Sequence, residues 1–148
     1  MISRASTAAL TLAAAAMGIA AFTGSMSVLA QGASSSALYT DDQAQKGVDP
    51  YENNCAMCHG ANMEGGQGPT LLGDTFTTHY QTVGDLMQFI VQNMPKSDPG
   101  SLSHEDYVDI LAYVLLKNGL PSGSQTLSFD TANTSKVPLT PAGSASGQ

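Results

Sequence analysis

Cys55 and Cys58 are the only cysteines in this chain of 148 residues, and His59 follows the second one directly. Two cysteines cannot form the disulfide framework that stabilises many small exported domains. If the motif forms a helical turn, residues three positions apart lie on the same face, so the two thiols point the same way and the imidazole of His59 lies beside them. The cysteines therefore define one chemical site, and the rest of the chain must fold so as to present it.

The spacing C-x-x-C-H at residues 55–59 is the attachment motif for c-type haem. In this interpretation Cys55 and Cys58 each bond a haem vinyl group, and His59 offers a ring nitrogen to the iron. We therefore predict one covalent haem c as the cofactor. A thioredoxin-type redox pair would need a strand–helix–strand setting, and structural zinc usually needs four protein ligands. The sequence indicates neither of these, and an isolated thiol pair would be unusual in an oxidising compartment.

The second axial ligand of a haem iron determines whether the site transfers electrons or binds small molecules. Met94 stands at a predicted helix end, followed by Pro95, on a loop that could fold over a haem, and we predict that it is this ligand. His79, in a loop, is the alternative, since imidazole is also a common iron ligand. His104, in the first turn of a predicted helix, is expected to be solvated. Three other methionines are less suitable by position or by apolar surroundings: Met57, Met63 and Met87.

The first residues have the pattern of a secretory signal. One positive charge, Arg4, precedes an uncharged alanine-rich stretch over residues 8–22, and Val28-Leu29-Ala30 forms a small-residue cleavage pattern before Gln31. We predict a signal peptide over residues 1–30 and export to the periplasm. An uncleaved anchor is the alternative, which the short, weakly apolar stretch disfavours. No stable membrane insertion is expected after cleavage.

Charge restricts the class of partner. Beyond the predicted signal peptide the chain has four lysines and all twelve of its Asp and Glu residues, so its net charge there is −8. Such a surface repels nucleic acid, which excludes that function class. It favours docking to a protein with a basic patch.

Helix signals place the folded domain at residues 39–121. Thr40 caps either one helix kinked near residues 47–50 or two short helices that end at Cys55, and residues 60–75 are predicted to be loop. Further helices begin after Thr82, ending near Met94, and after Ser103, ending near residue 118. Residues 31–38 are predicted to be a flexible lead-in, and residues 122–148 an extended or disordered tail in which Leu127 and Phe129 could touch the domain. The predicted fold class is all-α, with three to four short helices and long loops.

A domain of this size buries proportionally little of its own surface. The predicted helices are short and the loops between them are rich in glycine. A bulky apolar cofactor at the centre would supply the missing core.

Five sequence segments carry a resemblance to a known family: Tyr51–Gly60, Gly65–Pro69, Met94-Pro95, Pro99–Tyr113 and Asn118-Gly119. Over residues 39–121 the chain resembles the class I cytochromes c, especially the small bacterial ones associated with quinoprotein alcohol dehydrogenases. The resemblance implies a cytochrome c-like fold wrapped around the haem.

The resemblance also implies roles for single residues. The Pro69 carbonyl would accept a hydrogen bond from the far nitrogen of His59, and Leu71 would pack on the haem. The first helix, at Gly47 and Tyr51, would cross the last one at Ile110 and Tyr113. Two residues depart from the family pattern: Pro50 in the first helix, and Tyr80 where relatives often carry tryptophan.

These features predict a one-electron carrier outside the cytoplasm, not an enzyme. It would carry electrons between a dehydrogenase, of which a quinoprotein is one candidate, and a terminal acceptor. Its partners would be a periplasmic dehydrogenase, a terminal oxidase or another cytochrome. One alternative is a fixed electron-transfer subunit of a dehydrogenase complex. The other is a haem enzyme or gas sensor with an open iron position.

Overall fold

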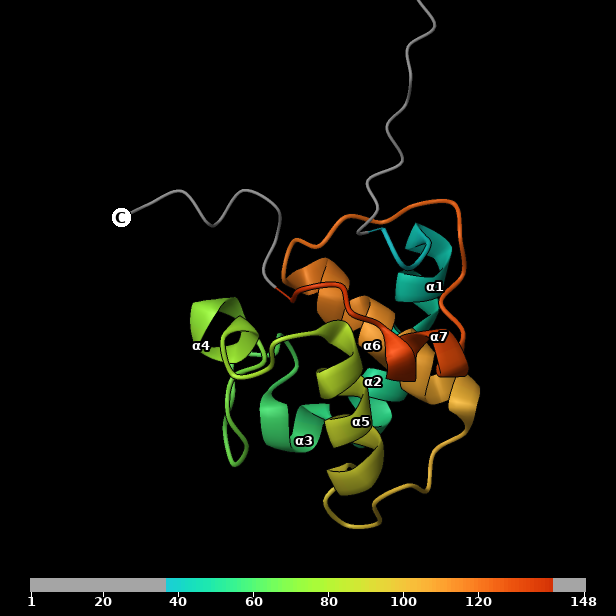
Figure 1. Cartoon of the computed structure of the whole chain (residues 1–148). Helices are drawn as coiled ribbons and strands as arrows, with labels where there is room; N and C mark the ends of the chain where they lie inside the picture. The colour runs from blue at the N-terminus through green and yellow to red at the C-terminus, as the bar shows by residue number, and fades with distance from the viewer. Residues whose placement is uncertain (1–36, 140–148) are drawn as a thin grey trace, which may run out of the picture. The chain divides into compact units, whose positions relative to one another are not determined.

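The computed structural model describes residues 37–139, and Figure 1 shows the arrangement of their helices. The predicted signal peptide, most of the lead-in and residues 140–148 lie outside the described residues. Apart from one isolated bridge between Thr82 and Pro138, residues 37–139 contain no β-structure. The helices are α1 (Asp41–Lys46), α2 (Val48–Asn54), α3 (Ala56–His59), α4 (Gly73–Thr77), α5 (Val83–Asn93), α6 (His104–Lys117) and α7 (Phe129–Thr134).

The first predicted helix is two short helices, α1 and α2. The Thr40 side chain accepts a hydrogen bond from the Gln43 amide, which confirms the predicted N-cap. Pro50 lies in the first turn of α2, where a missing amide hydrogen costs no helical hydrogen bond. The departure at Pro50 is therefore accommodated by a new helix start rather than by a kink.

Helices α5 and α6 begin at the predicted caps. Thr82 and Asp85 form a capping box, in which each side chain accepts a hydrogen bond from the backbone amide of the other, at 3.1 and 3.0 Å. Ser103 accepts from the Asp106 amide at 3.0 Å at the start of α6. Met94 is the residue at which α5 ends, as predicted.

Helix α6 is the centre of the packing and contacts α1, α2, α5 and α7. Its crossing with α1 and α2 is close because residue 47 has no side chain: a Cβ atom there would overlap the Asp109 carbonyl and lie 2.9 Å from Cβ of Tyr113. The Tyr51 ring meets the Tyr113 ring edge to face at 5.6 Å. The helix crossing that the family resemblance implied is therefore present.

The prediction of an extended or disordered tail is wrong for residues 127–139, although the expected contact of Leu127 with the domain is present. Leu127, Ala132 and Leu139 are buried in the core, and Ala132 belongs to helix α7, which lies between Leu127 and Leu139 along the chain. The side chain of Gln43 exchanges two hydrogen bonds with the backbone of Leu127, at 2.9 and 2.8 Å. The segment contains few apolar residues and no helical period, so its order comes from contacts with α1, α5 and α6 that local sequence does not reveal. The domain boundary predicted at residue 121 therefore moves to residue 139 at least.

Helix α4 was predicted as part of a loop, and a side chain from a distant helix fixes its start. Asn118, the C-cap of α6, donates to the Leu71 carbonyl at 2.8 Å and accepts from the Gly73 amide at 3.0 Å. The sequence gives no signal for a contact across 45 or more positions.

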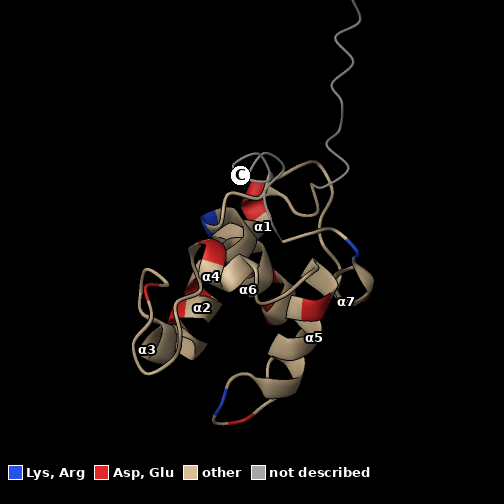
Figure 2. Cartoon of the chain, turned by 60° about the vertical axis from the view of Figure 1, so that its left-hand side comes forward, with Lys and Arg blue, Asp and Glu red and all other residues tan. Residues whose placement is uncertain are grey.

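All twelve acidic side chains and four lysines lie in the described range. Figure 2 shows acidic positions on several helices and basic positions at only a few isolated places. Within residues 37–139, no helix has both the length and the apolar character that crossing a membrane requires.

Candidate functional site

A cavity of about 610 Å³ opens between α2–α3, α4, α5 and α6. This volume is in the range of small-molecule and cofactor sites. The cavity contains the predicted site residues Cys55, Cys58, His59, Pro69 and Met94 in its lining. Its walls are otherwise mainly apolar, formed by Leu71, Phe76, Leu86, Ile90, Ile110 and Val114.

Cys55 and Cys58 face this cavity from the junction of α2 and α3. The amides of Cys58 and His59 both donate to the Cys55 carbonyl, at 3.1 and 2.9 Å, which makes the motif one tight helical turn. Both thiols are half-buried and unbonded. Burial, with the neighbouring Cys58, raises the pKa of Cys55 to about 11, so this side chain is a neutral thiol at physiological pH.

The imidazole of His59 is held in one orientation. The ring is 8% exposed, and its Nδ1 lies 2.8 Å from the Pro69 carbonyl oxygen. Because a carbonyl only accepts, Nδ1 carries the proton, and Nε2 has the lone pair that a metal ion can take. The hydrogen bond that the family resemblance implied for Pro69 is therefore present.

The glycine-rich loop after the motif is tied back to it. The amides of Gly65 and Gly68 donate to the carbonyls of His59 and Cys58, at 2.7 and 2.8 Å. Gly60 has a φ of +83°, a conformation that favours glycine, and its carbonyl accepts from the Tyr51 hydroxyl at 2.8 Å. These contacts bring Pro69 over the imidazole.

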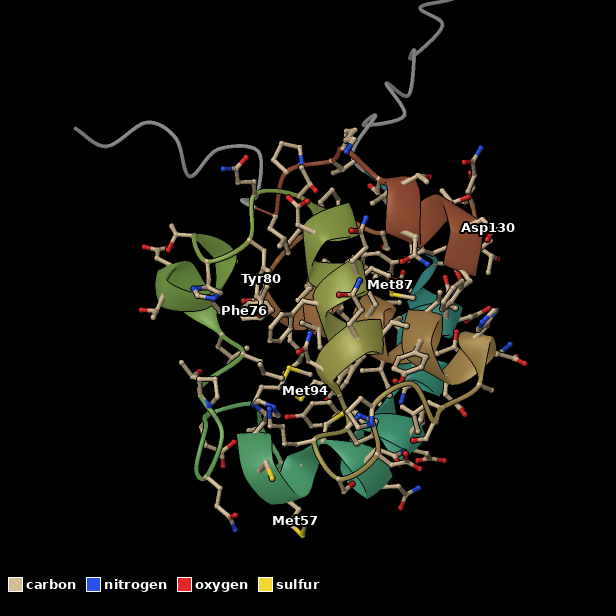
Figure 3. The ribbon with its side chains drawn as sticks, turned by 60° about the horizontal axis from the view of Figure 1, so that its bottom comes forward. Met57, Phe76, Tyr80, Met87, Met94 and Asp130 are labelled. Carbon is tan, nitrogen blue, oxygen red and sulfur yellow. The ribbon has the colours of Figure 1, made fainter. Side chains whose placement is uncertain are left out.

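Met94 faces the cavity from the end of α5. Figure 3 shows Met94 in the interior, between the ribbons of α3 and α5, whereas Met57 projects from the outer edge of α3. Met57 is 84% exposed, and Met63 and Met87 are fully buried in the core. Of the methionines in the described range, Met94 is the one that lines the cavity.

His79 also lines the cavity but is an exposed residue, and its ring packs edge to face on Tyr80 at 4.9 Å. Tyr80 is half-buried, and burial raises the pKa of its hydroxyl. His104 lies away from this cavity and is exposed, as predicted. Its ring stacks on Phe129 of α7 at 3.6 Å, nearly parallel.

The residues in the cavity fit a c-type haem. Two thiols lie one helical turn apart, an imidazole presents the lone pair of one nitrogen, and a thioether stands at the end of another helix. The apolar walls suit the porphyrin faces. The thioether side chain and the imidazole are both ligands that haem iron takes.

Sequence reasoning missed two residues that shape the site. Asn118 fixes the loop that carries Leu71, and the Tyr107 hydroxyl donates to the Met94 carbonyl at 2.7 Å. From the sequence, Tyr107 is expected to pack its ring on Leu102 at the start of the helix. That role does not predict a hydrogen bond from its hydroxyl.

Comparison with known proteins places these features in a family. The family model described as cytochrome c oxidase, cbb3-type, subunit III matches residues 42–114. The cbb3-type cytochrome c oxidase subunit CcoP of Rubrivivax gelatinosus is 36% identical over 90 residues, which are 57% of this chain and 30% of that protein. The crystal structure of the sulfane dehydrogenase SoxCD from Paracoccus pantotrophus is similar with a TM-score of 0.54 and 24% identity, over 72% of this chain and 62% of that one.

The chain thus spans less than a third of CcoP and under two thirds of the SoxCD chain. The structural similarity confirms the predicted fold class, an all-α cytochrome c-like fold. The family match confirms the expected cofactor class and a role in electron transfer.

Proposed function

Because the chain belongs to the class I c-type cytochromes, we propose that it is an exported single-haem carrier that moves one electron at a time between two redox proteins. The observation that carries this proposal is the apolar cavity shared by Cys55, Cys58, His59 and Met94. A haem c in this cavity would supply an iron that alternates between two oxidation states.

The chain's own residues would hold that group and set its properties. Cys55 and Cys58 would bind it through thioether bonds, and His59 and Met94 would be the two axial ligands. The Pro69 carbonyl keeps the proton on Nδ1 of His59 and so leaves Nε2 for the iron. The apolar walls, with Leu71 among them, would keep water from the faces of a bound haem, and a thioether ligand would raise its reduction potential.

The proposed partners are a dehydrogenase, with a quinoprotein as one candidate, and a terminal oxidase or another cytochrome. The similarity to a subunit of a cbb3-type oxidase supports a terminal oxidase as one of the two. The twelve acidic residues against four lysines support docking to a basic surface. Since such docking weakens as salt rises, co-purification with the partner should be lost at high ionic strength for a free carrier and retained for a fixed subunit.

The location is proposed to be the periplasm, on the basis of the signal pattern in residues 1–30. Expression of the full chain in a bacterium with cytochrome c assembly machinery should give coloured protein in the periplasmic fraction, shortened at its N-terminus. Coloured protein of full length in the membrane fraction would support the uncleaved anchor instead.

The mass of the matured protein tests the cofactor. We expect one haem per chain, both by intact mass and by the alkaline pyridine spectrum, and no haem in the double variant Cys55→Ala/Cys58→Ala. Colourless secreted protein with the mass of its polypeptide alone would overturn the proposal.

The second axial ligand is tested by Met94→Ala. The oxidised wild type should show the weak far-red absorption band of a sulfur-to-iron bond, and Met94→Ala should lack it. If the band survives in Met94→Ala, Met94 is not the ligand. If the reduced wild type binds carbon monoxide rapidly and fully, the iron has an open position and the haem enzyme or gas sensor is favoured.

A further inference from the structure

The peptide groups on both sides of the Met94 Cα atom are held by different helices. On one side the Met94 amide donates to the Ile90 carbonyl at 2.8 Å, as the last bond of α5. On the other side the Met94 carbonyl accepts from the Tyr107 hydroxyl of α6 at 2.7 Å. A weaker contact comes from the Gly100 amide at 3.4 Å.

The Met94 carbonyl is a group that the helix itself cannot satisfy. The last carbonyls of any helix have no partner within it, and Met94 follows the last residue of α5. Residues 96–101 beyond it form an exposed loop, whose own turns use the carbonyls of Pro95 and Asp98. The main anchor of the Met94 carbonyl is therefore a hydroxyl from another helix.

Tyr107 is well placed to give a rigid anchor. Its side chain is 1% exposed and lies in the first turns of α6, the helix at the centre of the packing. A buried ring has few rotamers to lose, so the hydroxyl is held in place by the core rather than by the bond itself.

We propose that Tyr107 is a positioning residue for the second axial ligand: through the Met94 carbonyl it keeps the Met94 side chain at the cavity. The inference rests on the proposed function, in which Met94 binds the iron. The Met94 side chain is flexible and has three rotatable bonds, so its backbone must be fixed for its sulfur to remain at one place. Without the Tyr107 hydroxyl the Met94–Lys96 segment, which lines the cavity, would leave it more often.

Tyr107→Phe tests this, because it removes the hydroxyl and keeps the ring in the core. Carbon monoxide is the probe, since it binds the reduced protein only while the sixth position is vacant. At saturating carbon monoxide, the binding rate is set by how often Met94 leaves the iron. This rate should rise roughly fivefold in Tyr107→Phe, because loss of one ordinary hydrogen bond changes the population of the open state by about that factor. The oxidised protein should show a weaker far-red band that fades at a lower temperature than in the wild type.

Tyr39→Phe is the matched control. Tyr39 is also 1% exposed, and its hydroxyl also donates to a backbone carbonyl, that of Leu120, but it does not line the cavity. Both variants should lower the melting temperature to a similar degree, whereas only Tyr107→Phe should change the carbon monoxide rate and the far-red band.

Equal carbon monoxide rates and equal bands in the two variants would overturn the role of Tyr107 while leaving Met94 as ligand. The Met94→Ala variant separates the two failures. If it binds carbon monoxide no faster than the wild type and keeps the band, both the ligand assignment and the inference are wrong. If it binds fast and Tyr107→Phe does not, only the inference is wrong.

Discussion

At Gly68 the backbone of the glycine-rich loop lies directly against the imidazole of His59. A Cβ atom at this position would lie 2.8 Å from Cε1 and 2.9 Å from Nδ1 of the ring. The ring cannot give way without losing its hydrogen bond to the Pro69 carbonyl, which is 2.8 Å long. The glycine is therefore required by close approach of the backbone to the proposed iron ligand.

We predict that Gly68→Ala lowers the melting temperature of the holo-protein and its yield of haem per chain. Overpacking of this kind costs about 1–3 kcal/mol. Gly66→Ala in the same loop is the control, because its Cβ atom would meet only the Cys58 carbonyl, at 3.2 Å. Thermal unfolding and the pyridine spectrum measure both effects, and equal losses in the two variants would show that the contact with His59 is not responsible.

Asp109 is a buried carboxyl at the junction of α1 and α6. Burial raises its pKa above the usual range, and Glu105 and Asp106 add to this, while a hydrogen bond from Gln43 and the charge of Lys46 partly offset it. The folded protein therefore keeps a proton here at pH values where the unfolded chain, with a pKa of about 3.9, has lost it.

This raised pKa predicts a stability that falls as pH rises. The contribution of Asp109 is fully present below about pH 4 and is lost as pH rises through the folded pKa. The Asp109→Asn variant should lack this loss, so its melting temperature relative to the wild type should increase from about pH 4 to about pH 7. A difference between the two proteins that does not change with pH would contradict the prediction.

At the level of elements, the segment after α7 packs along the start of α5. The amides of Val83 and Gly84 donate to the carbonyls of Val137 and Ser135, at 2.9 and 3.1 Å. A Cβ atom on Gly84 would lie 2.5 Å from the Ser135 carbonyl oxygen. The tail therefore supplies partners for the first amides of α5, which a helix cannot satisfy itself.

Gly84→Ala should therefore destabilise the protein, although alanine is the better helix former by about 1 kcal/mol. We expect a loss of about 1–3 kcal/mol in the free energy of unfolding, from overpacking against the tail. Gln88→Ala, which removes one exposed hydrogen bond to the Asn133 carbonyl, should cost less. Denaturant unfolding compares the two. A stabilised Gly84→Ala protein would show that the tail does not pack here.

At the scale of the whole described domain, the cavity occupies space between the helices that side chains would fill in a domain without a cofactor. Left empty, a cavity of about 610 Å³ would cost up to the order of 10 kcal/mol at roughly 24 cal/mol per Å³, although water entering its open mouth would reduce this. That is comparable with the total stability of a small domain, about 5–15 kcal/mol. We therefore expect the stability of the fold to depend on the group that fills the cavity.

Removal of the cofactor should accordingly unfold the tertiary structure. The apo-protein of Cys55→Ala/Cys58→Ala should lack a cooperative thermal transition and lose most of its helical circular dichroism, while the holo-protein melts cooperatively. The substitutions themselves are small and leave the rest of the core in place, so the loss would come from the missing group. A cooperative transition in the apo form would refute this prediction.

The sequence by itself determined the chemistry of the site and the short-range structure. The C-x-x-C-H spacing, the caps at Thr40, Thr82 and Ser103, and Met94 before Pro95 are all local signals, because a turn of helix and its cap involve only neighbouring residues. The outcome of these predictions is visible in α1, α5 and α6.

Only the tertiary structure decided how α7 is held, where α4 begins and what fixes the Met94 backbone. Each depends on a contact between residues far apart in sequence: Gln43 with Leu127, Asn118 with Leu71, and Tyr107 with Met94. Such contacts form because buried polar groups must find partners wherever the packing brings them together. That requirement leaves no periodic pattern in the sequence, so these long-range contacts cannot be predicted from local segments.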